Sequence, residues 1–465
     1  MVQIIDNLAI SLLSKPFAVL YGPSGTGKTR AAIELASKIN NTINTQRWFP
    51  IEADRNGNIL NGDSTDFRNM VNENNGNYFT VRSNYGSTNA SIEFCRTIEM
   101  NSVDADTFLS EERNNLEISA PVPFNIPCHK VIPIGSNWND NKHLMGHINP
   151  FGPNNEYIYE LTPFIELLIL ANHPTKRNIP FFAILDEMNL SHIEYYLSDI
   201  LSVMEISEDS SNNLISFENL LLIQRNLQNR SGESEYYNFL LESVDNLIDE
   251  NSGLPYSNNF FIIGTINIDE TTQMLSNKVI DRAHLIKVES MLPSLALENS
   301  NYSSILTDQE MLNKFQEINE YKAEKQIENS FVTCYKELVE EYEITIEEWD
   351  WIIDLLDQIY VSLSQIEQEF GYRIIKEVAT YLTIGLRYFG NSSEIKNLVN
   401  NVLNQKVFAK ISGNRRTLEA IIEQLSSILT NYETGENDNY FANSLKRVNE
   451  LRNKLRLRGQ ASFIS

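Results

Sequence analysis

The chain contains several short, mainly apolar segments that end at glycine or at polar residues. They read FAVLY from residue 17, HKVIPI from residue 129, FFAIL from residue 181 and FFIIGTIN from residue 260. Apolar runs of this length, bounded by turn-forming or polar residues, are typical of strands buried in a parallel sheet. Because parallel strands present their carboxyl ends at one edge of the sheet, we expect the polar residues that follow them to meet there.

The segments between these strands have other patterns. Residues 42–127 are polar and rich in asparagine, with alternating pieces such as YFTVRSNY that predict a β-rich insertion. Residues 207–259 form a second insertion, which includes the amphipathic sequence YYNFLLESVDNLIDE. From residue 291 to residue 465 the pattern is helical. The sheet-containing core is therefore expected to consist of residues 1–41, 128–206 and 260–290.

Length and charge restrict the possible partners. A chain of 465 residues exceeds the size at which one hydrophobic core keeps growing, so more than one module is expected. The net charge of −25 disfavours extended, sequence-independent DNA binding by this chain alone. The basic run KRVNELRNKLRLRG, from residue 446, is interpreted as a solvated helix face rather than a nucleic-acid site. Any DNA contact is expected to be indirect or to require an assembled ring.

The sequence is expected to be that of a cytoplasmic protein, because it shows neither a membrane span nor a secretory signal. No apolar run has the length needed to span a bilayer, so no membrane partner is expected. The first seventeen residues lack the basic segment that begins a secretory signal. Three widely spaced cysteines fit a reducing compartment better than a disulfide framework.

The sequence GPSGTGKT follows the first apolar segment and precedes a helical pattern, which is the arrangement of a P-loop. Its glycines allow backbone N–H groups to turn toward phosphates, and the helix N-terminus adds its positive dipole end. Lys28 is expected to contact the β- and γ-phosphates, and the Thr29 hydroxyl to bind Mg²⁺. The predicted nucleotide-binding residues are Gly22, Pro23, Ser24, Gly25, Thr26, Gly27, Lys28, Thr29 and Arg30.

The segment FFAIL leads directly into Asp186 and Glu187, at the expected ligand-binding edge. Asp186 is the second predicted Mg²⁺ residue, and Glu187 is predicted to orient the attacking water or accept its proton. The segment FFIIGTIN brings Thr265 and Asn267 to the same edge, where Asn267 would reach the γ-phosphate and the water.

Arg282 stands at the end of a short predicted helix and before another strand. In an AAA+ protein this is the position of an arginine finger, which acts on the nucleotide of a neighbouring subunit, and hydrolysis would then require a ring or at least a dimer. A helix-end ion pair between Asp281 and Arg282 is the structural alternative.

Longer stretches resemble the McrB family of AAA+ proteins, the motor subunits of modified-DNA restriction systems. The similar stretches are ILDEMNLSHIEYYLSDILSVME, IIGTINIDETTQMLSNKVIDRA, GYRIIKEVATYL, VIPIGSNWNDNKHLMGHINP, NQKVFAKISGNRRTL and SLKRVNELRNKLRLRGQASFIS. The resemblance implies an AAA+ α/β core with a helical lid, a hexameric ring, and hydrolysis of GTP or ATP with Mg²⁺. It also implies a separate nuclease or effector subunit in an antiviral complex. Arg373, near the start of a predicted lid helix, would be the sensor-2 arginine of its own subunit, the alternative being an ion pair with Glu377.

Two departures from the family leave questions open. The family signature Met-Asn-x-x-Asp occurs here as Ile266-Asn267-Ile268-Asp269-Glu270, which leaves the acidic position open between Asp269 and Glu270. The choice between GTP and ATP stays open with it. The P-loop also lies within the first thirty residues, so the DNA-reading domain of the type member is not expected before it. A protein-remodelling chaperone of the MoxR or dynein type, or a slow nucleotide-gated scaffold, are the alternatives to a restriction motor.

Overall fold

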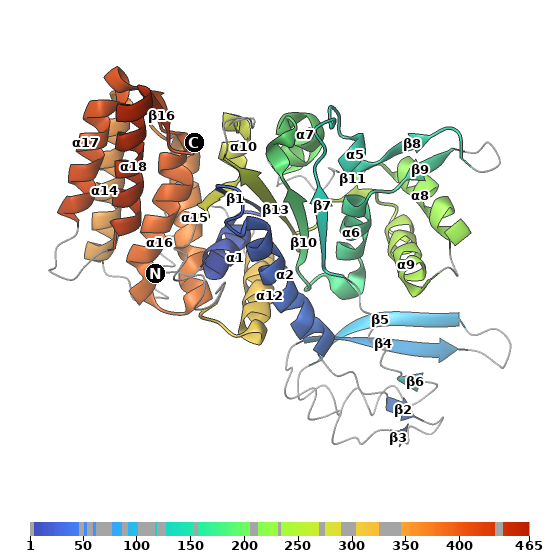
Figure 1. The fold of residues 1–465 in the computed structure, drawn as a ribbon. Helices are drawn as coiled ribbons and strands as arrows, with labels where there is room; N and C mark the ends of the chain where they lie inside the picture. Colours follow the sequence, from blue (N-terminus) through green and yellow to red (C-terminus); the bar gives the residue numbers. More distant parts are fainter. Residues whose placement is uncertain are drawn as a thin grey trace.

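A computed structural model gives the fold of the chain (Figure 1). It describes residues 4–45, 51–53, 59–61, 77–85, 92–100, 117–118, 127–152, 157–204, 213–230, 234–268, 275–289, 304–324, 346–432 and 440–464. Within residues 41–126 only the course of the backbone is described.

A five-stranded parallel sheet forms the centre of the molecule. Its strands are β1 (Phe17–Gly22), β7 (His129–Pro133), β10 (Phe181–Asp186), β13 (Phe260–Asn267) and β14 (His284–Lys287). They lie in the order β14-β1-β13-β10-β7, and each neighbouring pair is parallel. The prediction of an α/β fold with a parallel sheet is confirmed, and the four apolar segments are four of its strands.

Both faces of the sheet are covered over β1, β10, β13 and β14, since alternate residues of these strands belong to two different cores. On β1, Ala18 and Leu20 belong to one core, whereas Val19 belongs to the other. The first core includes residues of α1 (Ile4–Ser14) and α2 (Lys28–Thr45). The sheet is therefore the middle layer of three, which explains its continuous apolar strands.

The second core is covered by helices from the middle of the sequence. They are α6 (Pro163–Ala171), α7 (Ile193–Val203), α8 (Phe217–Arg230) and α9 (Glu235–Asp249). The Thr162 hydroxyl caps α6 by accepting from Ile165 N at 3.3 Å. Shorter elements precede, separate or follow these helices in the sequence: α5 (Lys142–Met145), the hairpin β8 (His147–Asn149) and β9 (Ile158–Glu160), and the paired strands β11 (Asn213–Ile215) and β12 (Leu254–Pro255).

Between α2 and β7 the described elements are strands. The hairpin of β4 (Asn77–Tyr85) and β5 (Ile92–Met100) is antiparallel along its whole length. A three-stranded sheet has the order β3-β2-β6, with β2 at Ile51–Ala53, β3 at Ile59–Asn61 and β6 at Glu117–Ile118. Figure 1 shows the hairpin beside the end of α2 and the three short strands below it, both away from the parallel sheet.

Most of the C-terminal helical region, residues 304–464, lies on the β14 side of the sheet (Figure 1). Its first helix instead packs on one face of the sheet, where Phe315 contacts Phe182 and Phe261. Its helices are α12 (Asp308–Glu324), α14 (Ile346–Ser364), α15 (Tyr372–Phe389), α16 (Ile395–Val402), α17 (Arg415–Asn431) and α18 (Ala442–Arg458). The short strands β15 (Ser412–Asn414) and β16 (Gln460–Ser462) pair beside them. Among the described residues, no helix combines the length and apolar character needed to cross a membrane.

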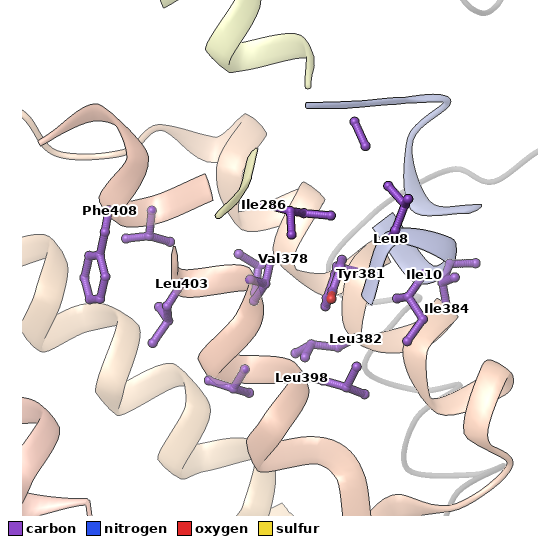
Figure 2. Close-up of a cluster of buried hydrophobic side chains, with 14 of the residues drawn as sticks. Leu8, Ile10, Ile286, Val378, Tyr381, Leu382, Ile384, Leu398, Leu403 and Phe408 are labelled. Carbon is purple, nitrogen blue, oxygen red and sulfur yellow. The ribbon is translucent and has the colours of Figure 1, made fainter. Parts of the chain in front are cut away.

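The C-terminal helical region shares one hydrophobic core with α1 and β14. Figure 2 shows Leu8 of α1 and Ile286 of β14 beside Val378 and Tyr381 of α15. The Asp6 carboxylate of α1, fully buried, accepts from the Tyr388 hydroxyl at 2.9 Å. The region is therefore joined to the sheet by continuous packing.

Helix α18 contacts the strand that leads into the P-loop. Arg447, which is 4% exposed, donates to the Tyr21 hydroxyl and to the Phe463 carbonyl oxygen, the latter at 3.1 Å. Lys287 of β14 pairs with Glu450 at 2.5 Å, and Lys446 pairs with Glu289. Part of the basic run interpreted as a solvated face therefore binds other parts of the chain, and Arg447 is buried.

We expect Gly264→Ala to lower the free energy of unfolding by about 1–3 kcal/mol, because an added methyl group would overpack the core. Gly264 lies in buried β13, and a Cβ atom there would overlap the Met188 sulfur atom. Urea denaturation measures the change. Gly371→Ala is the control, since a Cβ atom there has no neighbour within 4 Å, and equal effects of both substitutions would contradict the prediction.

Candidate functional site

The loop from Gly22 to Gly27 connects β1 to α2 at the carboxyl edge of the sheet. A Cβ atom on Gly22 would overlap the Val288 carbonyl oxygen, so only glycine fits there. Gly25 and Gly27 have φ angles of 77° and 84°, which side chains rarely adopt. At Gly25 nothing lies within 4 Å of an added Cβ atom, so the loop is open on that side. Pro23 and Ser24 are exposed on it.

Lys28 begins α2 and folds back over the loop. Its ammonium group donates to the Gly22 carbonyl oxygen at 3.0 Å and to the Pro23 carbonyl oxygen at 2.6 Å. Burial lowers the pKa of Lys28, whereas the carboxylates of Asp186 and Glu187 raise it. The lysine is thus held beside the loop and close to the acidic pair. The exposed Arg30 follows on the first turn of this 18-residue helix.

Three oxygen-bearing side chains meet at the end of β10. The Thr29 hydroxyl donates to Asp186 Oδ1 at 2.6 Å, and the Thr265 hydroxyl donates to the same oxygen at 2.7 Å. The two predicted Mg²⁺ residues, Thr29 and Asp186, are therefore in direct contact. Hydroxyl and carboxylate oxygens are also the ligands that Mg²⁺ prefers.

Glu187 stands just after β10 in a left-handed conformation, with φ of 56° and ψ of 46°. This is uncommon for a residue with a side chain, and such residues often occur at active sites. Its backbone N–H donates to the Thr265 hydroxyl oxygen at 3.0 Å, and its carboxylate accepts from Asn267 Nδ2 at 3.0 Å. The backbone and the side chain of Glu187 are each held by one residue of β13.

The strand order explains why these groups meet. β13 lies between β1 and β10, and its Asn267 is paired in register with Gly22. On the other side, Gly264 is paired with Leu185, so Thr265 lies beside Asp186. The structure thus brings the P-loop, the acidic pair and Asn267 to one edge, as the sequence predicted.

Two further residues belong to the site although they were not predicted as site residues. Thr265 bonds to Asp186 and to the Glu187 backbone, although the sequence indicated only its place at the edge. Asn189, which is 3% exposed, donates to the Asn267 carbonyl oxygen at 2.9 Å. The sequence signal that could have identified Asn189 as a site residue is its position two residues after Glu187.

Arg282 lies at the opposite edge of the sheet. It ends α10 (Asn277–Arg282) and donates to the Lys278 carbonyl oxygen at 3.0 Å. Only Ala283 separates it from β14, which runs parallel to β1 with His284 beside Ala18. Since a six-residue strand is roughly 20 Å long, Arg282 is far from the P-loop of its own chain.

Arg373 lies on the same side as Arg282 and not beside the P-loop. Its Nε contacts Glu377 Oε1 at 3.2 Å, the ion pair considered as the alternative to a sensor-2 role. The same Glu377 oxygen contacts Lys15 Nζ at 2.6 Å, and Lys15 precedes the amino end of β1.

Asp269 and Glu270, the two candidates for the acidic signature position, lie outside the described residues.

Comparison with known proteins gives one partial match. Residues 326–460 match a family described as a domain of unknown function, DUF8727. No curated protein matches the chain. The matched range contains helices α14 to α18 but none of the residues at the carboxyl edge.

Proposed function

We propose that the chain is a Mg²⁺-dependent nucleoside triphosphatase of the AAA+ class that hydrolyses ATP or GTP. The observation that carries the proposal is the convergence at one sheet edge of Lys28, the contact between Thr29 and Asp186, and the bond between Glu187 and Asn267. Each group meets a different requirement of phosphoryl transfer: binding of phosphate, binding of metal or handling of water.

The glycine loop and Lys28 bind the phosphates. The open side of the loop at Gly25 and the N-terminus of α2 favour an anion. Thr29 and Asp186 supply the oxygen ligands for Mg²⁺, whose positive charge offsets the charge of the phosphate oxygens when it is bound. Thr265 fixes the orientation of the Asp186 carboxylate by donating to it.

Glu187 and Asn267 act on water. The Glu187 carboxylate accepts a proton as the water oxygen forms a bond to the γ-phosphorus and the bond to the leaving diphosphate oxygen breaks. Asn267 orients this carboxylate through the 3.0 Å hydrogen bond. The left-handed backbone at Glu187 is the kind of strained conformation that often occurs at active sites.

Arg282 acts on the nucleotide of another subunit. Its place at the opposite edge keeps it from its own P-loop, so hydrolysis requires at least two subunits and, by the McrB resemblance, a hexameric ring. Repeated head-to-tail contacts that bring the amino edge of one sheet to the carboxyl edge of the next would close such a ring. Arg373 lies at the same edge of the sheet as Arg282, the edge where the strands begin. In this proposal it makes no contact with the phosphates of its own subunit.

The biological role follows from the sequence resemblance. We propose an antiviral restriction or defence complex in which this chain is the motor and a separate subunit is the nuclease or effector. Co-purification from the native host tests this role. A partner with a metal-dependent nuclease site, whose DNA cutting requires nucleotide hydrolysis by this chain, supports it. A partner that binds protein and has no hydrolytic residues would favour a remodelling chaperone.

We expect Lys28→Ala to abolish detectable binding of ATP and GTP, since the lysine supplies the positive charge for the phosphates. Calorimetry with a slowly hydrolysed analogue measures binding, and phosphate release with Mg²⁺ or with excess chelator measures the reaction. Lys38→Ala is the matched control, because this residue of the same helix pairs at 2.8 Å with Asp308 at the surface. Unchanged binding by Lys28→Ala, or full turnover without metal, would exclude the proposed function.

A further inference from the structure

A cluster of charged side chains surrounds the end of α10. Lys15 Nζ donates to the Asp281 carbonyl oxygen at 2.8 Å, and Lys406 Nζ donates to the same oxygen at 3.3 Å. Both ammonium groups also contact Glu377, at 2.6 Å and 2.7 Å. Asp281 directly precedes Arg282 in the sequence. The two lysines, each paired with Glu377, therefore bind the carbonyl oxygen of the peptide group that joins Asp281 to Arg282.

The members of the cluster come from separate elements. Lys15 lies between α1 and β1, Glu377 lies on α15, and Lys406 lies in the π-helical turn η5 (Leu403–Val407). A third lysine, Lys410, forms an ion pair with the Asp281 side chain. The end of this short helix is thus held by lysines from parts of the chain that are distant from it in sequence.

Charge and burial indicate that this arrangement is rigid. The Lys406 side chain is 1% exposed and that of Glu377 14% exposed. Burial alone would raise the pKa of Glu377, but Lys406 and Lys15 outweigh it and hold that pKa well below its usual range. Burial lowers the pKa of Lys15 to about 7, an effect that Lys406 strengthens and Glu377 opposes. Charges buried at such cost are stable only with good geometry, and the carbonyl end of α10 adds a favourable negative partial charge.

We propose that Glu377, through Lys15 and Lys406, positions Arg282 for the nucleotide site of the neighbouring subunit. This inference rests on the proposed function, in which Arg282 acts between subunits. Helix α10 has only six residues, so little of its own hydrogen bonding fixes its last residue. Because Glu377 is on α15, the cluster also makes the C-terminal helical region the support of this arginine.

The expected result is that Glu377→Gln lowers kcat by about 10²-fold and leaves the KM for nucleotide nearly unchanged, since a misplacement of about 1 Å suffices for such a loss. The glutamine has no charge and replaces one acceptor oxygen with an NH2 group, which cannot accept from an ammonium group, so the end of α10 shifts. A residue that only maintained the nucleotide site of its own subunit would change KM as well. Steady-state hydrolysis over a range of nucleotide concentrations separates the two effects.

Mixed rings identify the subunit on which Glu377 acts. A Glu377→Gln subunit keeps a sound nucleotide site, so mixing it with Glu187→Gln subunits should recover turnover, because the latter supply a correctly placed Arg282. Mixing it with Arg282→Ala subunits should recover none, since neither then supplies a functional arginine. The opposite pattern, recovery only with Arg282→Ala, would overturn the inference.

Two further variants complete the experiment. Glu419→Gln removes an equivalent carboxylate from an exposed pair with Arg415 at 2.9 Å, and it should leave turnover unchanged. Lys15→Met, measured in parallel, removes one donor to Asp281 while leaving Glu377 in place, so it tests the same contact if the glutamine variant fails to fold. Normal kcat for this variant would contradict the inference. If Arg282→Ala and Glu187→Gln fail to complement each other, the proposed role of Arg282 is itself wrong.

Discussion

Glu187→Gln is expected to bind nucleotide and Mg²⁺ normally while its hydrolysis slows by about 10²–10⁴-fold, the usual contribution of a general base. The substitution keeps the size of the side chain and an oxygen that can accept from Asn267. It removes the group that takes the proton of the water. The contacts of Lys28, Thr29 and Asp186 remain, so affinity should not fall.

Phosphate release and binding of a fluorescent nucleotide together test this expectation. Glu194→Gln is a suitable control, since that carboxylate lies on the first turn of α7, beyond the end of β10. Turnover of the Glu187 variant at the wild-type rate would show that another group handles the water. Loss of nucleotide affinity would show instead that Glu187 is needed to shape the site.

Arg282→Ala is expected to lose about 10³-fold or more in hydrolysis rate, because an arginine finger stabilises the charge of the transition state. Its distinctive property is recovery in trans. Arg282→Ala subunits retain Glu187, and Glu187→Gln subunits retain Arg282, so a mixture of the two inactive proteins contains competent interfaces. With random mixing in equal amounts, about a quarter of the interfaces in a head-to-tail ring would be competent.

The control for this prediction is Arg177→Ala, which removes an exposed arginine paired with Glu250 at 3.6 Å. Such a surface pair contributes little, so turnover should be unchanged. If Arg282→Ala hydrolyses nucleotide normally, Arg282 has only a structural role at the end of α10. If the single variant is inactive but mixtures stay inactive, the arginine acts within its own subunit.

The carboxyl edge was predictable because its determinants are local. The glycines of the P-loop allow special backbone angles, and the short apolar segment before Asp186 and Glu187 is typical of a buried strand that ends there. The polar ends of such strands then meet by the geometry of parallel sheets. Even the contact of Thr29 with Asp186 follows from the usual roles of these residues, although it spans 157 positions.

The amino edge was less predictable because its contacts depend on packing between distant helices. The amphipathic pattern around Arg373 predicts helix α15 but does not indicate which edge of the sheet the start of the helix approaches. That depends on how Glu377 meets Lys15, 362 residues away. For the same reason, nothing in the sequence around Asp281 indicated that its carbonyl group binds two lysines.

The core shared by α1, β14 and the C-terminal helical region has a consequence for synthesis of the protein. Tyr388 bonds to Asp6 across 382 residues, and Leu8 packs with residues of α15 that the ribosome adds much later. At a synthesis rate of about 5–20 residues per second, the apolar side of α1 remains without its packing partners for tens of seconds. During that time the nascent chain presents an uncovered hydrophobic helix, which is the kind of surface that chaperones bind. A polypeptide of residues 326–460 alone would have the converse problem, because it lacks the first helix that covers its own apolar surface.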